Sequence, residues 1–376
     1  MKHIPFLLCL VISLQFNSYA QPTTLPTVNI PGSEVRKIHS SIEQEEYELQ
    51  ISLPAGYEKG DKKYPVVYLM DSQWDFPLLK GLYGQQYFDG FIPEMIIVGV
   101  TWGGTNPNPD SLRARDYTPT NEKRLPQSGG AAKFLSFLRK EVIPLIETTY
   151  RADKDDRVLM GCSLGGLFTL YALFTEPGLF NRYIAASPAF SWDNEVIYQY
   201  EQEYYKNKYL AQATLFMCVG GVERGVPGFE KLAKHLSDRN YFSLQMKTRV
   251  LENTGHSGTK GEGYARGLQS VFERPLIKLS AAAVKKCTGS YQAKDGTKME
   301  IKSENNQLAI YFGGTDKFLL YAKDEDNLYA TAAFLNIHFN KDEQGNVMGF
   351  DLERYGRTDV VKRIMVNAVN ELLNGK

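Results

Sequence analysis

The amino-acid sequence predicts an α/β fold with a mostly parallel central sheet and helices on both faces, followed by a small antiparallel β domain. Between about Glu34 and Leu279, short apolar runs alternate with segments of helical periodicity. Unbroken apolar runs suit strands that are covered on both faces, and strands that alternate with helices join into parallel sheets through right-handed crossovers. From about Thr288 the hydrophobic period falls to two and turn residues recur at short spacing, which is typical of antiparallel strands.

The same patterns predict the individual elements in chain order. An entry hairpin is expected from Glu34–His39 and Glu45–Leu53. Buried strands are predicted at Tyr64–Met70, Met95–Val100, Arg157–Met160, Tyr183–Ala186 and Thr214–Val219, and a strand of alternating pattern is predicted at Ser243–Leu251. Helices are predicted at Ala131–Thr149, Gly165–Thr175, Phe229–Leu236 and Glu262–Phe272. The tail strands are expected at Met299–Lys302, Leu308–Phe312, Phe318–Tyr321, Leu328–Thr331, Ile337–Phe339 and Val347–Leu352.

Composition narrows the range of functions before any motif is considered. The 376 residues contain 43 lysines and arginines against 43 aspartates and glutamates, so the formal net charge is zero. Such a chain lacks the basic excess that holds a phosphate backbone, which argues against a general nucleic-acid binder. The hydrophobic share of 43% is ordinary for a folded protein and too high for a disordered one.

The N-terminus has the pattern of an export signal. Polar Lys2 precedes the apolar run Ile4–Leu14, and the small residue Ala20 offers a cleavage point. We therefore expect a signal peptide at residues 1–20 and an exported protein, periplasmic or secreted. An uncleaved membrane anchor is the alternative, but the apolar run is short for a membrane span.

The mature chain is expected to have two parts, an α/β domain at residues 21–279 and a small β-rich domain at residues 280–376. It retains Cys162, Cys218 and Cys287. An odd number of cysteines leaves at least one thiol unpaired, so a disulfide framework does not explain the fold. No other apolar run approaches about 20 residues, so no transmembrane span is expected after cleavage.

The strongest functional signal is the segment Gly161-Cys-Ser-Leu-Gly-Gly166, which follows a predicted strand and opens a predicted helix. Gly-x-Ser-x-Gly in this context is typical of a nucleophile elbow, a sharp turn that presents a strained serine between residues without bulk. Ser163 is therefore the predicted nucleophile. The N–H of Leu164, at the positive end of the helix, is a predicted oxyanion donor. A glycine-rich turn without catalysis is the alternative.

A serine nucleophile needs a base and an orienting carboxylate. His256 lies in a loop directly after the strand Ser243–Leu251, where α/β enzymes place their chemistry, and it follows Ser163 in the expected chain order. The acid should lie between these two residues in the sequence, and Glu223 comes just past the strand Thr214–Val219. The sequence therefore predicts a Ser163–His256–Glu223 triad.

Two parts of this assignment have alternatives. A surface ion pair with Arg224 is the non-catalytic interpretation of Glu223, and Glu230 is a nearby carboxylate that falls in a predicted helix. The second oxyanion donor is assigned to the backbone N–H of Gln73, in the loop after the strand that ends at Met70.

These segments together resemble the putative-esterase family of α/β-hydrolases, which contains esterase D-like enzymes, siderophore esterases, feruloyl and acetyl-xylan esterases, and mycolyltransferases. The matching features are Tyr64-Pro-Val-Val-Tyr-Leu-Met-Asp71, Gly161-Cys-Ser-Leu-Gly-Gly166, Ala186-Ser-Pro188 and Gly255-His256-Ser257. Arg113-Ala-Arg-Asp-Tyr-Thr-Pro119 further resembles a segment of the siderophore-esterase-like branch. The resemblance covers about Glu34 to Leu279 and implies an α/β-hydrolase fold with the triad and oxyanion donors named above. Ser72 is a departure, because family members often have glycine after this aspartate.

The reaction that follows is hydrolysis of a carboxylic ester through an acyl-enzyme, without a metal or other cofactor. The substrate is expected to be an aryl, siderophore or carbohydrate ester, because aromatic walls suit such groups. Five residues are expected to line its pocket: Trp74, Arg113, Arg115, Tyr117 and Trp192. Ordinary packing is the alternative for each aromatic residue, and pairing with Asp110 and Asp116 is the alternative for the two arginines.

Two other functions fit the same sequence. An acyltransferase would use the same acyl-enzyme, because an alcohol competes with water for it. A non-catalytic protein that retains the fold would bind a glycan or a partner protein through the β domain.

Overall fold

A computed structural model describes residues 29–58, 60–207, 211–274, 276–304, 307–331, 334–354 and 357–364. The predicted signal peptide at residues 1–20 lies outside the described residues. All the elements named below belong to one compact unit that begins at Gly32. Among these residues, no helix combines the length and the apolar character needed to cross a membrane.

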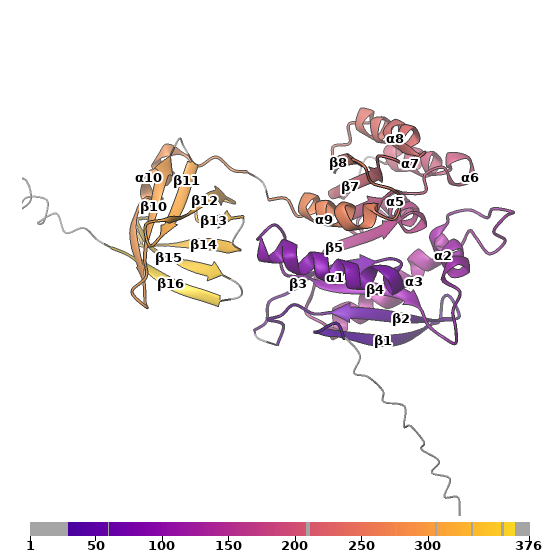
Figure 1. Ribbon diagram of the computed structural model, residues 1–376, viewed down its shortest axis with the longest axis horizontal. Coiled ribbons are helices and arrows are strands. Elements are labelled where there is room, and N and C mark those ends of the chain that lie inside the picture. Colours follow the sequence, from indigo (N-terminus) through magenta and orange to yellow (C-terminus); the bar gives the residue numbers. More distant parts are fainter. Residues whose placement is uncertain are drawn as a thin grey trace, which may run out of the picture. The chain divides into compact units, whose positions relative to one another are not determined.

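An eight-stranded sheet forms the first part of this unit, with the strand order β1-β2-β4-β3-β5-β6-β7-β8 (Figure 1). The strands are β1 Ser33–Ser40, β2 Glu45–Ser52, β3 Tyr64–Leu69, β4 Ile96–Trp102, β5 Ala152–Cys162, β6 Arg182–Ala186, β7 Ala213–Gly220 and β8 Leu244–Leu251. The β1–β2 hairpin joins the sheet by antiparallel pairing with β4, and all later neighbours are parallel. The mostly parallel sheet predicted from the sequence is confirmed.

Helices connect these strands and lie on both faces of the sheet. They are α1 Ser72–Phe88, α2 Pro109–Tyr117, α3 Ala131–Phe137, α4 Ile143–Thr149, α5 Leu164–Thr175, α6 Trp192–Glu195, α7 Ile197–Lys206, α8 Val226–Asp238 and α9 Thr259–Val271. A π-helical turn, Leu138–Val142, joins α3 to α4. The pleat of β6 separates the faces: Tyr183 belongs to the aromatic core with α3 and α5, whereas Ile184 abuts Gly267 of α9.

Helix α1 carries weak sequence signals, and the sequence analysis did not predict it. The helix contains Pro77, Gly81 and Gly84, which are poor residues for a helix interior. It forms because Phe76 and Leu79 are buried against the sheet, so tertiary packing outweighs local propensity.

The C-terminal strands form a closed antiparallel barrel in the order β10-β11-β12-β13-β14-β15-β16-β9. Helix α10 Ala281–Cys287 precedes the strands β9 Gly289–Ala293, β10 Lys298–Glu304, β11 Gln307–Phe312, β12 Asp316–Ala322, β13 Asn327–Ala330, β14 Leu335–Lys341, β15 Val347–Arg354 and β16 Arg357–Arg363. The sequence predicted a meander, and the structure adds its closure, in which Val361 of β16 pairs with Ala293 of β9. Closure removes the exposed edges that a meander would leave. Tyr291, Ile301 and Phe350 are among the buried side chains of the barrel core.

Candidate active site

Ser163 occupies a strained turn between β5 and α5. Its backbone angles are φ 59° and ψ −117°, a region that residues other than glycine rarely enter. A Cβ atom on Gly161 would lie 2.5 Å from the carbonyl oxygen of Gly165, so the turn closes only with glycine at position 161. This geometry is that of a nucleophile elbow, in which the serine hydroxyl is presented at the end of a strand.

The strand register places the other predicted residues at the same edge of the sheet. Cys162, which precedes the serine, pairs with Ala186 of β6, and Ala186 pairs with Cys218 of β7. Gly220 at the end of β7 pairs with Leu251 at the end of β8. The loops that follow these strands carry Ser163, Ser187, Glu223 and His256, so all four residues belong to the carboxyl edge of the parallel strands.

His256 and Glu223 are in direct contact. The imidazole Nδ1 lies 2.7 Å from Oε2 of Glu223, and the imidazole is half exposed whereas the carboxylate is mostly buried. The other carboxylate oxygen, Oε1, accepts the Ser187 hydroxyl at 2.6 Å and the backbone N–H of Gly220 at 2.7 Å. Glu223 is therefore held by three donors and faces one side of the imidazole.

Burial raises the pKa of Glu223, but the hydrogen bonds from Ser187, His256 and Gly220 outweigh burial and hold the pKa below its ordinary value. The carboxylate is consequently ionised at neutral pH. An ionised carboxylate at Nδ1 fixes the imidazole tautomer in which Nε2 is free to accept a proton.

Ser163 and His256 share this edge, yet no hydrogen bond joins Ser163 Oγ to His256 in the described part of the chain. Hydrogen bonds and contacts of the adjacent residues link the two loops that carry them. The N–H of Ser163 donates to the carbonyl of Ala186 at 3.0 Å, and the Thr259 hydroxyl donates to the carbonyl of His256 at 2.6 Å. Cys162 Sγ lies 3.9 Å from Thr259 Oγ1. Catalytic hydrogen bonds are often long before substrate binds.

The two predicted oxyanion donors sit in the first turns of two helices. Leu164 is the first residue of α5 and Gln73 is the second residue of α1. Backbone N–H groups in a first turn lack intrahelical acceptors and point toward the positive end of the helix dipole. A Cβ atom on Gly165 would lie 3.3 Å from both Met70 Cβ and Asp71 Oδ2, so the β3–α1 connection abuts the elbow.

A buried ion pair that the sequence analysis missed fixes the β3–α1 connection. Asp71 is fully buried in a left-handed conformation, with φ 55°, and Arg113 binds its two carboxylate oxygens at 3.0 and 2.8 Å. Burial raises the pKa of Asp71, and the Arg113 hydrogen bonds oppose that shift. The backbone N–H of Asp71 donates to the Tyr117 hydroxyl at 3.1 Å. The sequence signals were an aspartate after a buried strand and an arginine 42 positions later.

Three of the five predicted pocket residues have other roles. Tyr117 is fully buried, so its prediction as a pocket wall is wrong. Arg113 pairs with Asp71 and not with either carboxylate named as its alternative partner. Arg115 binds Asp116 at 2.6 Å and Glu45 at 2.8 Å, as the ion-pair alternative expected for Asp116.

The two tryptophans remain accessible. Trp74, in the first turn of α1, is 48% exposed, with Arg113 and Lys260 positioned 5.8 and 5.7 Å from its ring. Trp192 is partly buried and donates its indole N–H to Thr120 at 3.1 Å. Both cations bind buried carboxylates, Arg113 that of Asp71 and Lys260 that of Asp75, so it is the exposed indole that favours contact with an aromatic group.

The other described histidines have separate partners. His39 contacts Glu46, His235 contacts the buried Glu201, and His338 contacts Asn327. Among the residues that the structure describes, no group of three histidine, cysteine or acidic side chains is arranged to hold a metal ion.

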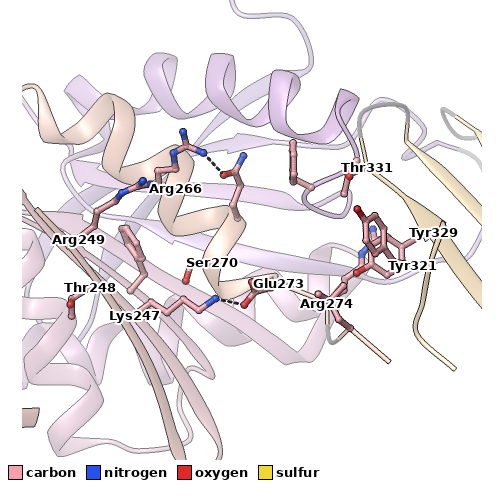
Figure 2. Close-up of a pocket in the computed structure, with 15 residues that line it drawn as sticks. Lys247, Thr248, Arg249, Arg266, Ser270, Glu273, Arg274, Tyr321, Tyr329 and Thr331 are labelled. Atoms are coloured by element: carbon pink, nitrogen blue, oxygen red, sulfur yellow. Dashed lines mark hydrogen bonds and ion pairs between the residues drawn. The ribbon is translucent and has the colours of Figure 1, made fainter. Parts of the chain in front are cut away.

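A pocket of about 560 Å³ lies away from this constellation, and none of the residues that line it is Ser163, Glu223 or His256. Its lining includes Lys247 and Arg249 of β8 and Arg266 and Glu273 of α9. Figure 2 shows Lys247 paired with Glu273, and Arg266 turned toward a glutamine of the same helix. Much of its cationic charge is thus engaged by neighbouring side chains.

Comparisons with known proteins agree with this fold. Residues 40–216 match the family described as putative esterase. The chain is 35% identical over 181 residues to ferri-bacillibactin esterase BesA of Bacillus subtilis, covering 45% of this chain and 62% of that protein. It is 30% identical over 169 residues to the siderophore enterobactin esterase of Emericella nidulans, covering 40% of this chain and 56% of that protein. The alignments therefore span less than two thirds of either relative.

A solved structure shows the same architecture. The BES protein from Bacillus cereus superposes with a TM-score of 0.61 at 28% identity, covering 67% of this chain and 98% of that chain. Residues 40–216 are thus similar to the putative-esterase family, and the α/β part of the chain shares its fold with this solved structure.

Proposed function

We propose that the protein is a serine carboxylic-ester hydrolase that acts through Ser163, His256 and Glu223. The observation that carries the proposal is a serine with the strained backbone of a nucleophile elbow, φ 59°, at the sheet edge where His256 and Glu223 lie 2.7 Å apart. The match of residues 40–216 to the putative-esterase family supports the same chemistry.

The reaction proceeds in two half-steps. His256 Nε2 takes the hydroxyl proton as Ser163 Oγ attacks the ester carbonyl, and the tetrahedral intermediate then collapses. The C–O bond to the alcohol breaks, His256 returns the proton to that oxygen, and an acyl-enzyme remains. Water attacks the acyl-enzyme with His256 again as base, which releases the acid and restores Ser163. Glu223 orients the imidazole and stabilises its positive charge.

The N–H groups of Leu164 and Gln73 are the proposed donors to the oxyanion. Each belongs to the first turn of a helix, where a free N–H and the helix dipole favour developing negative charge. Losing one oxyanion donor typically lowers kcat by about 10²–10³-fold.

The substrate class that the comparisons favour is a siderophore ester. Two relatives are named as a ferri-bacillibactin esterase and an enterobactin esterase. The exposed indole of Trp74 suits stacking on an aromatic acyl group. Trp192 is the second proposed pocket residue. A carbohydrate ester is the second candidate, because exposed aromatic faces also stack on sugar rings.

Three features of the chain belong to the same proposal. The pattern at residues 1–20 supports export to the periplasm or the medium, and N-terminal sequencing of the mature protein tests it by looking for a start at Gln21. We take residues 21–279 as the catalytic domain. The C-terminal domain, residues 280–376, is assigned no catalytic step, and removing it should leave ester hydrolysis measurable.

A panel of esters tests the function and the substrate class together. Wild type and Ser163→Ala are assayed on p-nitrophenyl acetate, a catecholate trilactone, a feruloyl ester and an acetylated sugar, first in water and then with added alcohol acceptors. The proposal expects hydrolysis by wild type, with the highest kcat/KM on the catecholate, and none by the variant. Products that carry the acyl group on the added alcohol would indicate an acyltransferase. A folded wild type without activity or covalent labelling would indicate a binding protein.

A further inference from the structure

Ser187, in the loop after β6, touches the proposed acid of the triad but has no role in the reaction steps above. We propose that Ser187 is a positioning residue, whose hydroxyl fixes the Glu223 carboxylate so that Oε2, and not Oε1, faces His256. This inference rests on the proposed function and adds a residue to its machinery.

The two oxygens of Glu223 have different neighbours. Oε1 accepts from Ser187 Oγ at 2.6 Å and from the N–H of Gly220 at 2.7 Å, whereas Oε2 faces His256 Nδ1 at 2.7 Å. The Gly220 N–H comes from the chain segment that carries Glu223, three residues away. Ser187 comes from a different strand connection, 36 residues earlier in the sequence. The hydroxyl therefore ties the acid to the neighbouring loop and restricts rotation of the carboxylate.

Backbone strain at Ser187 places this hydroxyl. The residue is 4% exposed and has φ 38°, a value that glycine adopts freely and that a side chain makes costly. Its N–H donates to the carbonyl of Cys218 at 2.7 Å, which anchors the strained residue to the end of β7. A glycine would relieve the strain but would remove the donor to Glu223.

The same hydroxyl lies beside the loop that carries the base. Ser187 Oγ is 3.1 Å from Oγ1 of Thr259, and the Thr259 hydroxyl donates to the backbone carbonyl of His256 at 2.6 Å. Because a hydroxyl has one proton and the carboxylate is the stronger acceptor, the Ser187 proton belongs to Glu223. Ser187 thus contacts both the proposed acid, Glu223, and Thr259, the residue that holds the backbone of the proposed base.

Electrostatics give the hydroxyl a second effect. Burial raises the pKa of Glu223, and among the interactions that lower it the Ser187 hydrogen bond comes first. The nearby titratable groups are His256 on the β8–α9 loop and the buried thiols of Cys162 and Cys218 on the strands. Burial raises the pKa of each thiol to about 12, so both stay neutral in the working range. The Ser187 hydrogen bond therefore helps to keep the Glu223 carboxylate ionised beside the imidazole.

The experiment compares Ser187→Ala and Ser187→Gly with wild type and with Thr175→Ala. Thr175 is the matched control, because its hydroxyl donates only to the Tyr171 carbonyl one turn back in α5. We measure kcat and KM for p-nitrophenyl acetate, thermal unfolding, and the NMR resonance of the His256 Nδ1 proton, which reports the contact with Glu223. Both Ser187 variants should lose about tenfold in kcat at unchanged KM, the usual scale for a lost hydrogen bond to a charged group.

The glycine variant separates positioning from a merely structural role. It should be at least as stable as wild type, because glycine relieves the strain, and yet remain as impaired in kcat as the alanine variant. A glycine variant with wild-type kcat and an unchanged resonance of the His256 Nδ1 proton would overturn the inference. The NMR measurement does not require turnover. An inactive wild type would contradict the proposed function, whereas an active wild type with unaffected Ser187 variants would contradict only this inference.

Discussion

The carboxyl edge of the sheet and the C-terminal barrel differ in how their backbones enter left-handed conformations. At the edge, Asp71, Ser163 and Ser187 have φ values of 55°, 59° and 38°. In the described part of the barrel, every residue with positive φ is a glycine, as at Gly296 and Gly345. Strain at residues that carry side chains is costly and persists where the surrounding structure holds it, often at functional sites. The comparison indicates that the edge retains strain to present side chains, whereas the barrel avoids it.

The largest expected effect comes from Ser163. Ser163→Ala removes the nucleophile and should lower kcat by roughly 10⁵-fold or more, with the fold retained. Ser163→Gly should be equally inactive but more stable than Ser163→Ala by about 1 kcal/mol, because glycine enters this conformation without strain. Steady-state kinetics and thermal unfolding of the two variants measure both effects. Equal stability of the two variants would contradict the comparison between edge and barrel, because the backbone would then carry no strain at Ser163.

Glu223 should have a smaller effect on rate. Glu223→Ala should lower kcat by about 10²–10⁴-fold, less than loss of the nucleophile, because the serine and the oxyanion donors remain. The measurement is kcat on p-nitrophenyl acetate, with Glu230→Ala as the control on the exposed face of α8. If Glu230→Ala proved the more damaging variant, the acid assignment would move to that residue.

The same carboxylate predicts a pH dependence of stability. Hydrogen bonds hold the folded-state pKa of Glu223 below its ordinary value of 4.5, so its stabilising contribution is present above about 4.5 and is lost as the pH falls through the folded value. The difference in unfolding free energy between wild type and Glu223→Gln should therefore shrink on acidification below that value. Urea unfolding at a series of pH values measures this difference, and a difference that widened instead would have the wrong sign.

Arg113 should act on stability as well as on rate. Arg113→Met leaves the fully buried Asp71 without its bidentate partner, and breaking such a pair typically costs about 3–5 kcal/mol. The loss should also lower kcat, because Asp71 begins the turn that presents Gln73. Chemical denaturation and kinetics measure the two effects. A double variant, Asp71→Asn with Arg113→Met, is the control and should recover part of the lost stability.

The smallest expected effect belongs to the barrel. Gly296 has φ +91° and open space around it, so Gly296→Ala should destabilise the barrel by about 1 kcal/mol through backbone strain and leave kcat unchanged. Gly81→Ala is the same chemical change in the interior of α1, also in open space, and should stabilise by up to about 1 kcal/mol. The opposite signs test whether the left-handed turn, and not the added methyl group, sets the cost. A fall in kcat for Gly296→Ala would show that the barrel takes part in the reaction.

Local signals predicted the parallel sheet and the residues of the candidate site. The elbow could be predicted because its glycines, strand and helix are adjacent in the sequence. His256 and Glu223 were predicted because each lies in a loop directly after a strand. The structure brings those two residues into contact, and their catalytic roles stay predictions. The Asp71–Arg113 pair, the Ser187 contact and the β9–β16 closure join segments far apart in the chain, so periodicity and spacing did not reveal them. Helix α1 was missed because its proline and glycines suppress the local pattern.

Covalent labelling with a fluorophosphonate tests the central claim most directly. The reagent reacts with a serine only when a nearby base activates it and an oxyanion site receives the phosphoryl oxygen. Peptide mapping by mass spectrometry should find a single phosphonyl adduct, on Ser163 of folded wild type, and none on the His256→Ala variant. A folded wild type that stays unmodified, or that carries the adduct on another residue, would contradict the account.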